Sequence, residues 1–226
     1  GVEPGAPGAG DDAVVEGTSL VYTVSLSNAS SVATTYPFSL GGGTATAGAD
    51  YTNAAVFSNG VTLVGGVITV PAGVTSFTVT VPTIDDVLAE PGANETLPLT
   101  IGGVTGIGAI IDNDGAPSVS SVSADTRTEG TALVHTVTLS NASSVQTSFA
   151  YSLGGGTATG AGVDYTTPPT FSNGVTLVGG NLLVPAGVTS FTITVPTTLD
   201  LIDEGASENY NLSVGGVVAV GTITDD

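Results

Sequence analysis

The sequence predicts an all-β protein made of two tandem antiparallel β-sandwich domains arranged end to end. Three observations predict this class: apolar residues that alternate with a period of two, turn residues between the alternating stretches, and an internal duplication. FSNGVTLVGG occupies 57–66 and returns at 171–180, and VPAGVTSFT occupies 70–78 and returns at 184–192. LSNASSV (26–32 and 139–145) and SLGGGTAT (39–46 and 152–159) keep nearly the same offset. Each copy therefore corresponds to one domain.

The alternating stretches are rich in Val, Thr, Ile and aromatic residues, which favour half-buried strands. Turn pairs such as Asn59-Gly60 and Gly65-Gly66 separate them, so each copy offers about seven strands, as in an Ig-like sandwich. The expected inward faces are Leu20/Tyr22/Val24/Leu26, Phe77/Val79/Val81 and Leu97/Leu99/Ile101, then Leu133/His135/Val137/Leu139, Phe191/Ile193/Val195 and Tyr210/Leu212/Val214.

The predicted boundary lies at the segment 112–117, where Asp-Asn-Asp-Gly-Ala-Pro forms a short linker. The first repeat spans 1–115, with a flexible N-terminal segment at 1–11, and the second spans 116–226. Proline at the end of the linker restricts the backbone, which favours an end-to-end arrangement.

Composition excludes several classes of function. The formal charge is −19 and Lys and Arg together number 1, so a basic surface for nucleic acid is impossible. An anionic membrane would repel the chain, and no stretch is apolar enough to predict direct insertion into a membrane. Hydrophobic residues make up 41% of the chain, which favours a folded protein over a disordered acidic one.

The acidic residues recur in the same short segments of each copy and are separated by long uncharged stretches. Decoration of exposed loops would explain any single acid, but it would also scatter charges over the outer strand faces, which carry Thr and Ser. Carboxylates gathered in this way call for a cation, and Ca²⁺ takes about 6–8 oxygen ligands in flexible geometry. Zinc is disfavoured without cysteine, whereas magnesium remains open. The candidate ligands are Glu16, Asp50, Asp85, Asp86, Glu90, Glu95, Asp112 and Asp114 in the first copy, then Asp125, Glu129, Asp164, Asp200, Asp203, Glu204, Glu208, Asp225 and Asp226.

Three segments of the first copy carry a resemblance to a known family. GTATAGADYT (43–52), ITVPAGVTSFTVTVPTIDDVLAEPGANE (68–95) and AIIDND (109–114) resemble the Calx-β domain, and the resemblance covers essentially the whole of each copy. It implies a seven-stranded sandwich that binds calcium at one end. The ligands it implies are Glu16, Asp50, Asp85, Asp86, Glu90, Asp112 and Asp114.

The second copy departs from this pattern, because Leu199 replaces the first Asp of the Asp-Asp pair. The tandem, nearly Lys-free form is also similar to the extender repeats of bacterial RTX-type surface adhesins.

We do not expect an enzyme, because the chain has no Cys, no Lys and one His. His135 takes the place of Tyr22 on the apolar face and is expected to be a core residue. The leading hypothesis is a pair of calcium-rigidified spacer repeats of an extracellular bacterial surface adhesin, projecting a distal binding domain for cell adhesion or biofilm formation. Its partners would be neighbouring repeats of the same chain, in a monomeric rod. The alternatives are an adhesive module for a glycan or protein and a Calx-β calcium sensor of a membrane partner.

Overall fold

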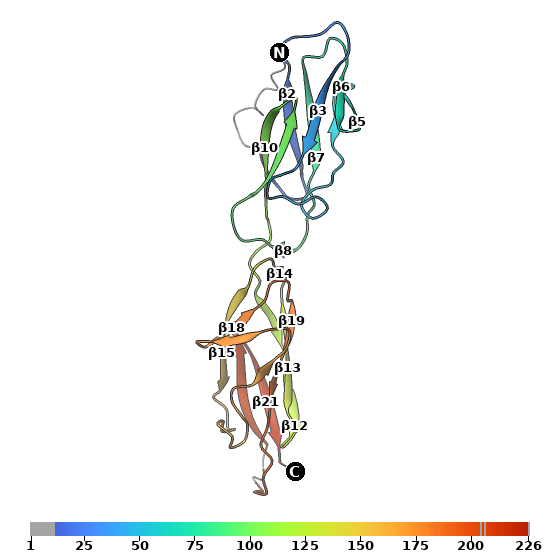
Figure 1. Ribbon diagram of the computed structural model, residues 1–226. Helices are drawn as coiled ribbons and strands as arrows, with labels where there is room; N and C mark the ends of the chain where they lie inside the picture. The colour runs from blue at the N-terminus through green and yellow to red at the C-terminus, as the bar shows by residue number, and fades with distance from the viewer. Residues whose placement is uncertain (1–11, 204, 206, 226) are drawn as a thin grey trace. The chain divides into compact units, whose positions relative to one another are not determined.

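The computed structural model describes residues 12–203, 205 and 207–225, and every regular element in these ranges is a β-strand. The chain divides into two compact units, the first formed by Gly1–Asp86 and Gly92–Asn113 and the second by Val87–Pro91 and Asp114–Asp226. Each unit packs two sheets face to face, which confirms the predicted all-β sandwich class (Figure 1). A helix able to span a membrane is not found among the described residues.

The first unit has a six-stranded and a three-stranded sheet. The larger sheet has the order β1 (Ala13–Val15), β10 (Val104–Ile111), β9 (Glu95–Ile101), β3 (Thr34–Leu40), β6 (Val67–Val70), β5 (Thr62–Val64). The smaller sheet has the order β2 (Ser19–Ser25), β7 (Ser76–Pro82), β4 (Val56–Phe57).

The second unit repeats this plan with one additional strand, β11, in its smaller sheet. Its six-stranded sheet has the order β12 (Asp125–Thr128), β21 (Val217–Thr224), β20 (Glu208–Val214), β15 (Thr147–Gly154), β18 (Asn181–Val184), β17 (Thr176–Val178). The facing sheet has the order β11 (Val119–Val122), β13 (Leu133–Leu139), β19 (Ser190–Val195), β16 (Thr170–Phe171). A further two-residue ladder joins β14 (Ala142–Ser143) to β8 (Leu88–Ala89).

Most strand ladders of the described residues are antiparallel, as predicted. Three ladders are parallel: β1 with β10, β12 with β21, and β8 with β14. β1 borders β10 because the chain leaves β1 at Gly17, whose φ is +78°, and crosses to the other sheet to form β2.

The predicted period of two is confirmed in the core. β2 alternates strictly between exposed and buried residues, and β7 and β19 alternate between buried and more open positions. The predicted inward residues of β9 and β20 are all buried. The core therefore lies between the two sheets of each unit, as a sandwich requires.

One buried polar contact differs between the copies. In the first unit the Tyr22 hydroxyl donates a hydrogen bond to the carbonyl of Leu97 on β9, at 2.6 Å. In the second unit His135 replaces Tyr22 and Tyr210 replaces Leu97. His135 Nε2 lies 2.8 Å from the Tyr210 hydroxyl and Nδ1 lies 2.7 Å from the Ser123 carbonyl.

A carbonyl can only accept, so His135 Nδ1 carries a hydrogen, and in the neutral imidazole Nε2 then accepts from the Tyr210 hydroxyl. The imidazole is fully buried, which confirms its expected place in the core. Burial lowers the pKa of His135, although the Ser123 carbonyl and the charge of Asp125 oppose the shift.

Acid should therefore weaken the second unit before the first. The ordinary pKa of histidine is about 6.5. As the pH falls through this value, His135 of the unfolded chain is protonated while the buried imidazole of the folded chain stays neutral. The unfolded state then binds more protons than the folded state, so the free energy of unfolding falls. Replacing His135→Tyr together with Tyr210→Leu copies the first unit's pair and should remove this pH dependence. Amide signals of each unit, followed by NMR in denaturant at about pH 7.5 and about pH 5.5, measure it. An equal loss in both units of the unaltered chain would contradict the assignment.

Candidate metal centre

Two carboxylates of the first unit meet where β1 and β10 end. The ladder pairs Val15 with Ile111, and the Glu16 amide extends it by donating to the Ile111 carbonyl at 3.1 Å. Because the two strands are parallel, the residues that follow them, Glu16 and Asp112, leave the sheet at the same end. Glu16 and Asp112 each offer a carboxylate oxygen within 4.8 Å of the other. Asp114 begins the second unit. The sequence analysis named both Glu16 and Asp112, but their convergence depends on the parallel pairing.

The loop that follows β7 brings two more carboxylates to this end. Gly17 has no side chain, and a Cβ built there would lie 2.8 Å from the Cβ of Asp85. Asn113 donates its backbone amide to Glu16 Oε1 and its side-chain amide to Asp85 Oδ1, each at 3.0 Å. Asn113 thus ties the two acids together. Sequence reasoning missed it, and the only signal was its position between Asp112 and Asp114.

Glu16 is the electrostatic centre of this group. Only 9% of its surface is exposed. Burial raises its pKa; the negative charges of Asp86 and Asp112 add to the rise, and the hydrogen bond from Asn113 opposes it. The single Lys or Arg of the sequence, Arg127, lies in the second unit, where its Nε is 3.0 Å from Asp125. No basic side chain of the first unit can therefore balance these acids.

A second pair joins Asp50 and Glu95, again with carboxylate oxygens within 4.8 Å of each other. Glu90 belongs to the Val87–Pro91 segment of the second unit. Asp50 is 8% exposed, and its Oδ2 accepts a hydrogen bond from the Thr46 amide. Its backbone carbonyl accepts from the Ile84 amide at 2.9 Å. Asp50 therefore organises its loop as well as contributing to the pair.

The second copy repeats the backbone arrangement around the first carboxylate pair but lacks the charge that Asp85 supplies there. The Glu129 amide donates to the Thr224 carbonyl at 2.9 Å, as Glu16 does to Ile111. Leu199 lies over Gly130 in the place that Asp85 takes over Gly17. Among the described residues of this copy no three carboxylates lie within 4.8 Å of one another.

The remaining predicted ligands of the second copy come from several segments. Asp164 accepts from the Thr159 amide, and Asp200 accepts from the Ile202 amide at 2.7 Å. Asp203 is exposed, Glu208 begins β20 and Asp225 follows β21. Glu204 and Asp226 lie outside the described residues.

Asp125 contacts two backbone amides and Arg127. Its carboxylate accepts from the backbone amides of Thr126 and Val134, each at 2.9 Å, in addition to its ion pair with Arg127. Partial burial opposes its ionisation, but the Val134 amide and Arg127 outweigh that effect and lower its pKa. The structure places it among its own donors and not in either carboxylate group.

Comparisons with known proteins give structural likeness only. No protein-family model matches the chain, and no curated protein matches it. Among solved structures, the calcium binding domain CBD12 of CALX1.1 is 18% identical with a TM-score of 0.35, covering 89% of this chain and 76% of that chain. CBD12 from CALX1.2 is 18% identical with a TM-score of 0.37, covering 91% and 77%. The titin I-band fragment I67-I69 is 11% identical with a TM-score of 0.28, covering 95% and 62%. The fold assignment rests on the strand pairing described above.

Gly17→Ala should disrupt the first carboxylate group. The new methyl would meet Asp85 at 2.8 Å and sit at a φ of +78°, so we expect a loss of about 1–2 kcal/mol from the backbone alone, and more from the contact. Gly66→Ala is the matched control, because Gly66 has the same φ and nothing within 4 Å. Denaturant unfolding of both variants measures the difference. Equal losses would show that Asp85 does not pack on Gly17.

Proposed function

We propose that the first unit binds calcium through Glu16, Asp85, Asp86 and Asp112, and that the tandem serves as a spacer in a longer surface-attached protein. One observation carries the calcium proposal. Carboxylates from three separate segments, at Glu16, at Asp85 and Asp86, and at Asp112, lie close together at one end of a sandwich that has no basic side chain to balance them. Such an arrangement is costly without a cation, because like charges repel most strongly where water is partly excluded.

The donor set fits calcium better than the other common metals. It consists of oxygen atoms alone, on loops and strand ends, and Ca²⁺ accepts about 6–8 carboxylate, carbonyl and water oxygens in flexible geometry. Magnesium prefers fewer protein ligands and retains its waters, and zinc prefers nitrogen and sulfur. When bound, the ion supplies positive charge that offsets the repulsion. The chain's own part is to hold Glu16 and Asp85 in place through Asn113.

The spacer proposal rests on repetition. Two copies with one topology suit a role that depends on length, whereas a specific binding site needs only one version. Extracellular calcium is plentiful, so sites of modest affinity would stay filled outside the cell. The expected location is therefore the bacterial surface, with neighbouring repeats as partners in a monomeric chain. An adhesive module and a calcium sensor of a membrane partner are the alternatives.

Calcium should stabilise the first unit through Glu16. At a concentration 100 times its dissociation constant, a ligand bound only by the folded state adds about 2.7 kcal/mol. Glu16→Gln keeps the oxygen that accepts from Asn113 but removes a charge, so it should be at least as stable as the unaltered chain in chelator and gain less from calcium. Thermal unfolding in chelator, calcium and magnesium measures these differences.

Asp125→Asn is the control for this experiment. It removes the ion pair with Arg127, so it should lower the stability by a similar amount with and without calcium. If calcium raises the thermal stability of the unaltered chain and of its Glu16→Gln variant by the same amount, the calcium proposal is wrong.

Stiffening by calcium separates the spacer from its alternatives. Small-angle X-ray scattering of the chain in calcium and in chelator should show a larger maximum dimension with calcium, because bound ions would hold together loops that otherwise repel. Glu16→Gln should reduce the change. Calcium binding without any change in dimension would favour an adhesive module or a sensor.

A further inference from the structure

An identical loop has a different environment in the two units. The sequence LSNASSV occupies 26–32 and 139–145. In both places the middle serine is held in the same way: the Ser30 carbonyl accepts from the Gly73 amide at 2.8 Å, and the Ser143 carbonyl accepts from Gly187 at 2.9 Å. The amides of Val32 and Val145 donate to the serine hydroxyls, each at 3.2 Å. The two loops therefore present the same backbone edge.

In the second unit this edge is paired with an extended segment. β8 runs parallel to β14, with Leu88 opposite Ala142 and Ala89 opposite Ser143 (Figure 1). The Ser144 amide donates to the Ala89 carbonyl at 2.9 Å. As a result Ser143 is only 4% exposed and Ala89 only 2% exposed. The second unit is thus completed by five residues, Val87–Pro91, that come from an earlier part of the chain.

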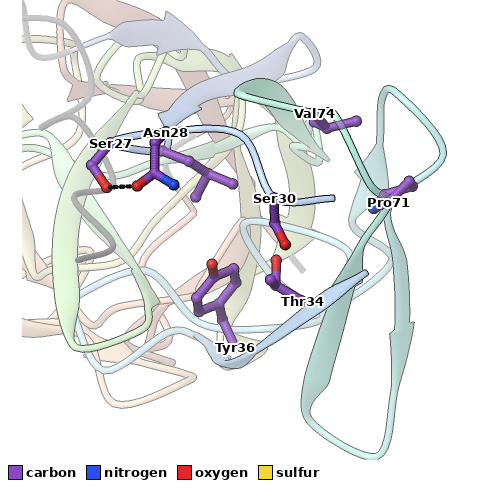
Figure 2. A pocket seen from close by; sticks show the side chains of 8 residues that line it. Ser27, Asn28, Ser30, Thr34, Tyr36, Pro71 and Val74 are labelled. Carbon is purple, nitrogen blue, oxygen red and sulfur yellow. Dashed lines mark hydrogen bonds between the residues drawn. The ribbon is translucent and has the colours of Figure 1, made fainter. Parts of the chain in front are cut away.

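In the first unit no described segment pairs with the same edge. Ala29 and Ser31 are exposed, and Ser30 is less buried than Ser143. A cavity of about 300 Å³ lies beside the edge. Figure 2 shows it between the segment that carries Ser27, Asn28 and Ser30, the side chains of Thr34 and Tyr36 on β3, and the turn with Pro71 and Val74.

The second copy carries a segment of the kind that could fill this edge. Its loop after β19 aligns with the loop that contains β8 through the shared Leu-x-acid-x-Gly spacing, which places Leu201 at Leu88 and Gly205 at Gly92. Ile202 then takes the place of Ala89. Leu201 is 102% exposed and Ile202 is 64% exposed. Two adjacent apolar side chains in water at a loop tip are typical of a surface that is covered in an assembly.

We propose that the Ala29–Ser31 edge of the first unit accepts the Leu201–Ile202 loop of a second copy of this chain. The contact would be a short parallel ladder like that of β8 with β14, with Leu201 opposite Ala29 and Ile202 opposite Ser30. The donor and acceptor surfaces differ, so the contact is head to tail and can repeat from one copy to the next. The inference does not depend on the metal proposal.

A ladder of two residues is weak between separate molecules. Its strength in a chain of repeats comes from linkage, which gives an effective concentration on the order of 1 mM for short connections. A test must therefore trap a weak contact at a similar concentration. The chain contains no cysteine, so engineered cysteines can report it without background.

Disulfide trapping tests the proposal. The chain with Ala29→Cys is mixed with the chain with Leu201→Cys at about 1 mM, and the rate of mixed dimer formation is measured under mild oxidation. The matched control replaces the first chain with Ala142→Cys, whose edge already pairs with β8. We expect the Ala29→Cys mixture to cross-link at least about tenfold faster, since paired strand positions suit disulfide geometry. Leu88→Cys with Ala142→Cys in one chain should close internally and is the positive control.

Three outcomes would overturn the proposal. The first is an equal rate for Ala29→Cys and Ala142→Cys, and the second is no cross-link to Ala29→Cys while the positive control closes. The third is an internal disulfide between Ala29→Cys and Ala6→Cys, which would assign the edge to the chain's own N-terminal segment. NMR of the folded chain supplies a measurement free of cysteine. The Ala29–Val32 amide signals should shift as the concentration rises, and Ile202→Asp should abolish the shift.

Discussion

The parallel pairing of the first strand with the last strand decides where the charges of the first unit gather. In a wholly antiparallel sheet, neighbouring strands end at opposite edges, which would separate Glu16 from Asp112. Because β1 and β10 run the same way, both residues leave the sheet together. Gly17 then turns the chain towards β2, and its missing side chain leaves room for Asp85. The carboxylate group is thus a consequence of topology and of one glycine.

This geometry places acids closer together than their charges favour. Asn113 relieves part of the conflict with two hydrogen bonds. Burial, and after it the charges of Asp86 and Asp112, still raise the pKa of Glu16. Hydrogen bonds to an amide cannot cancel the repulsion among Glu16, Asp86 and Asp112, because they supply no net charge. A divalent cation supplies positive charge and can therefore cancel this repulsion. The physical case for calcium therefore comes from the protein's own unbalanced charge, and the sequence supplies no internal alternative in the first unit.

The sequence predicted the sandwich because burial in a strand follows the pleat: the alternation of Leu20, Tyr22 and Val24 is a direct record of which face is covered. It could not predict which acids meet, because that depends on the parallel β1–β10 pair, which no local pattern encodes. Asn113 escaped notice because it is uncharged. The partner of His135 was also hidden, since it depends on a residue 75 positions away. Local sequence patterns therefore determine which face of a strand is buried, whereas contacts between distant strands determine which side chains form a site.

The duplication makes each unit a control for the other. Where the first unit has Tyr22 and Leu97, the second has His135 and Tyr210, and each unit keeps a buried hydrogen bond at this position. Where the first unit has Asp85, the second has Leu199, and no three carboxylates of the described second copy lie within 4.8 Å of one another. A buried polar group without a partner destabilises the fold, so the core must change in pairs. A carboxylate on a loop can be lost singly, which is why the two copies share a fold but differ in charge.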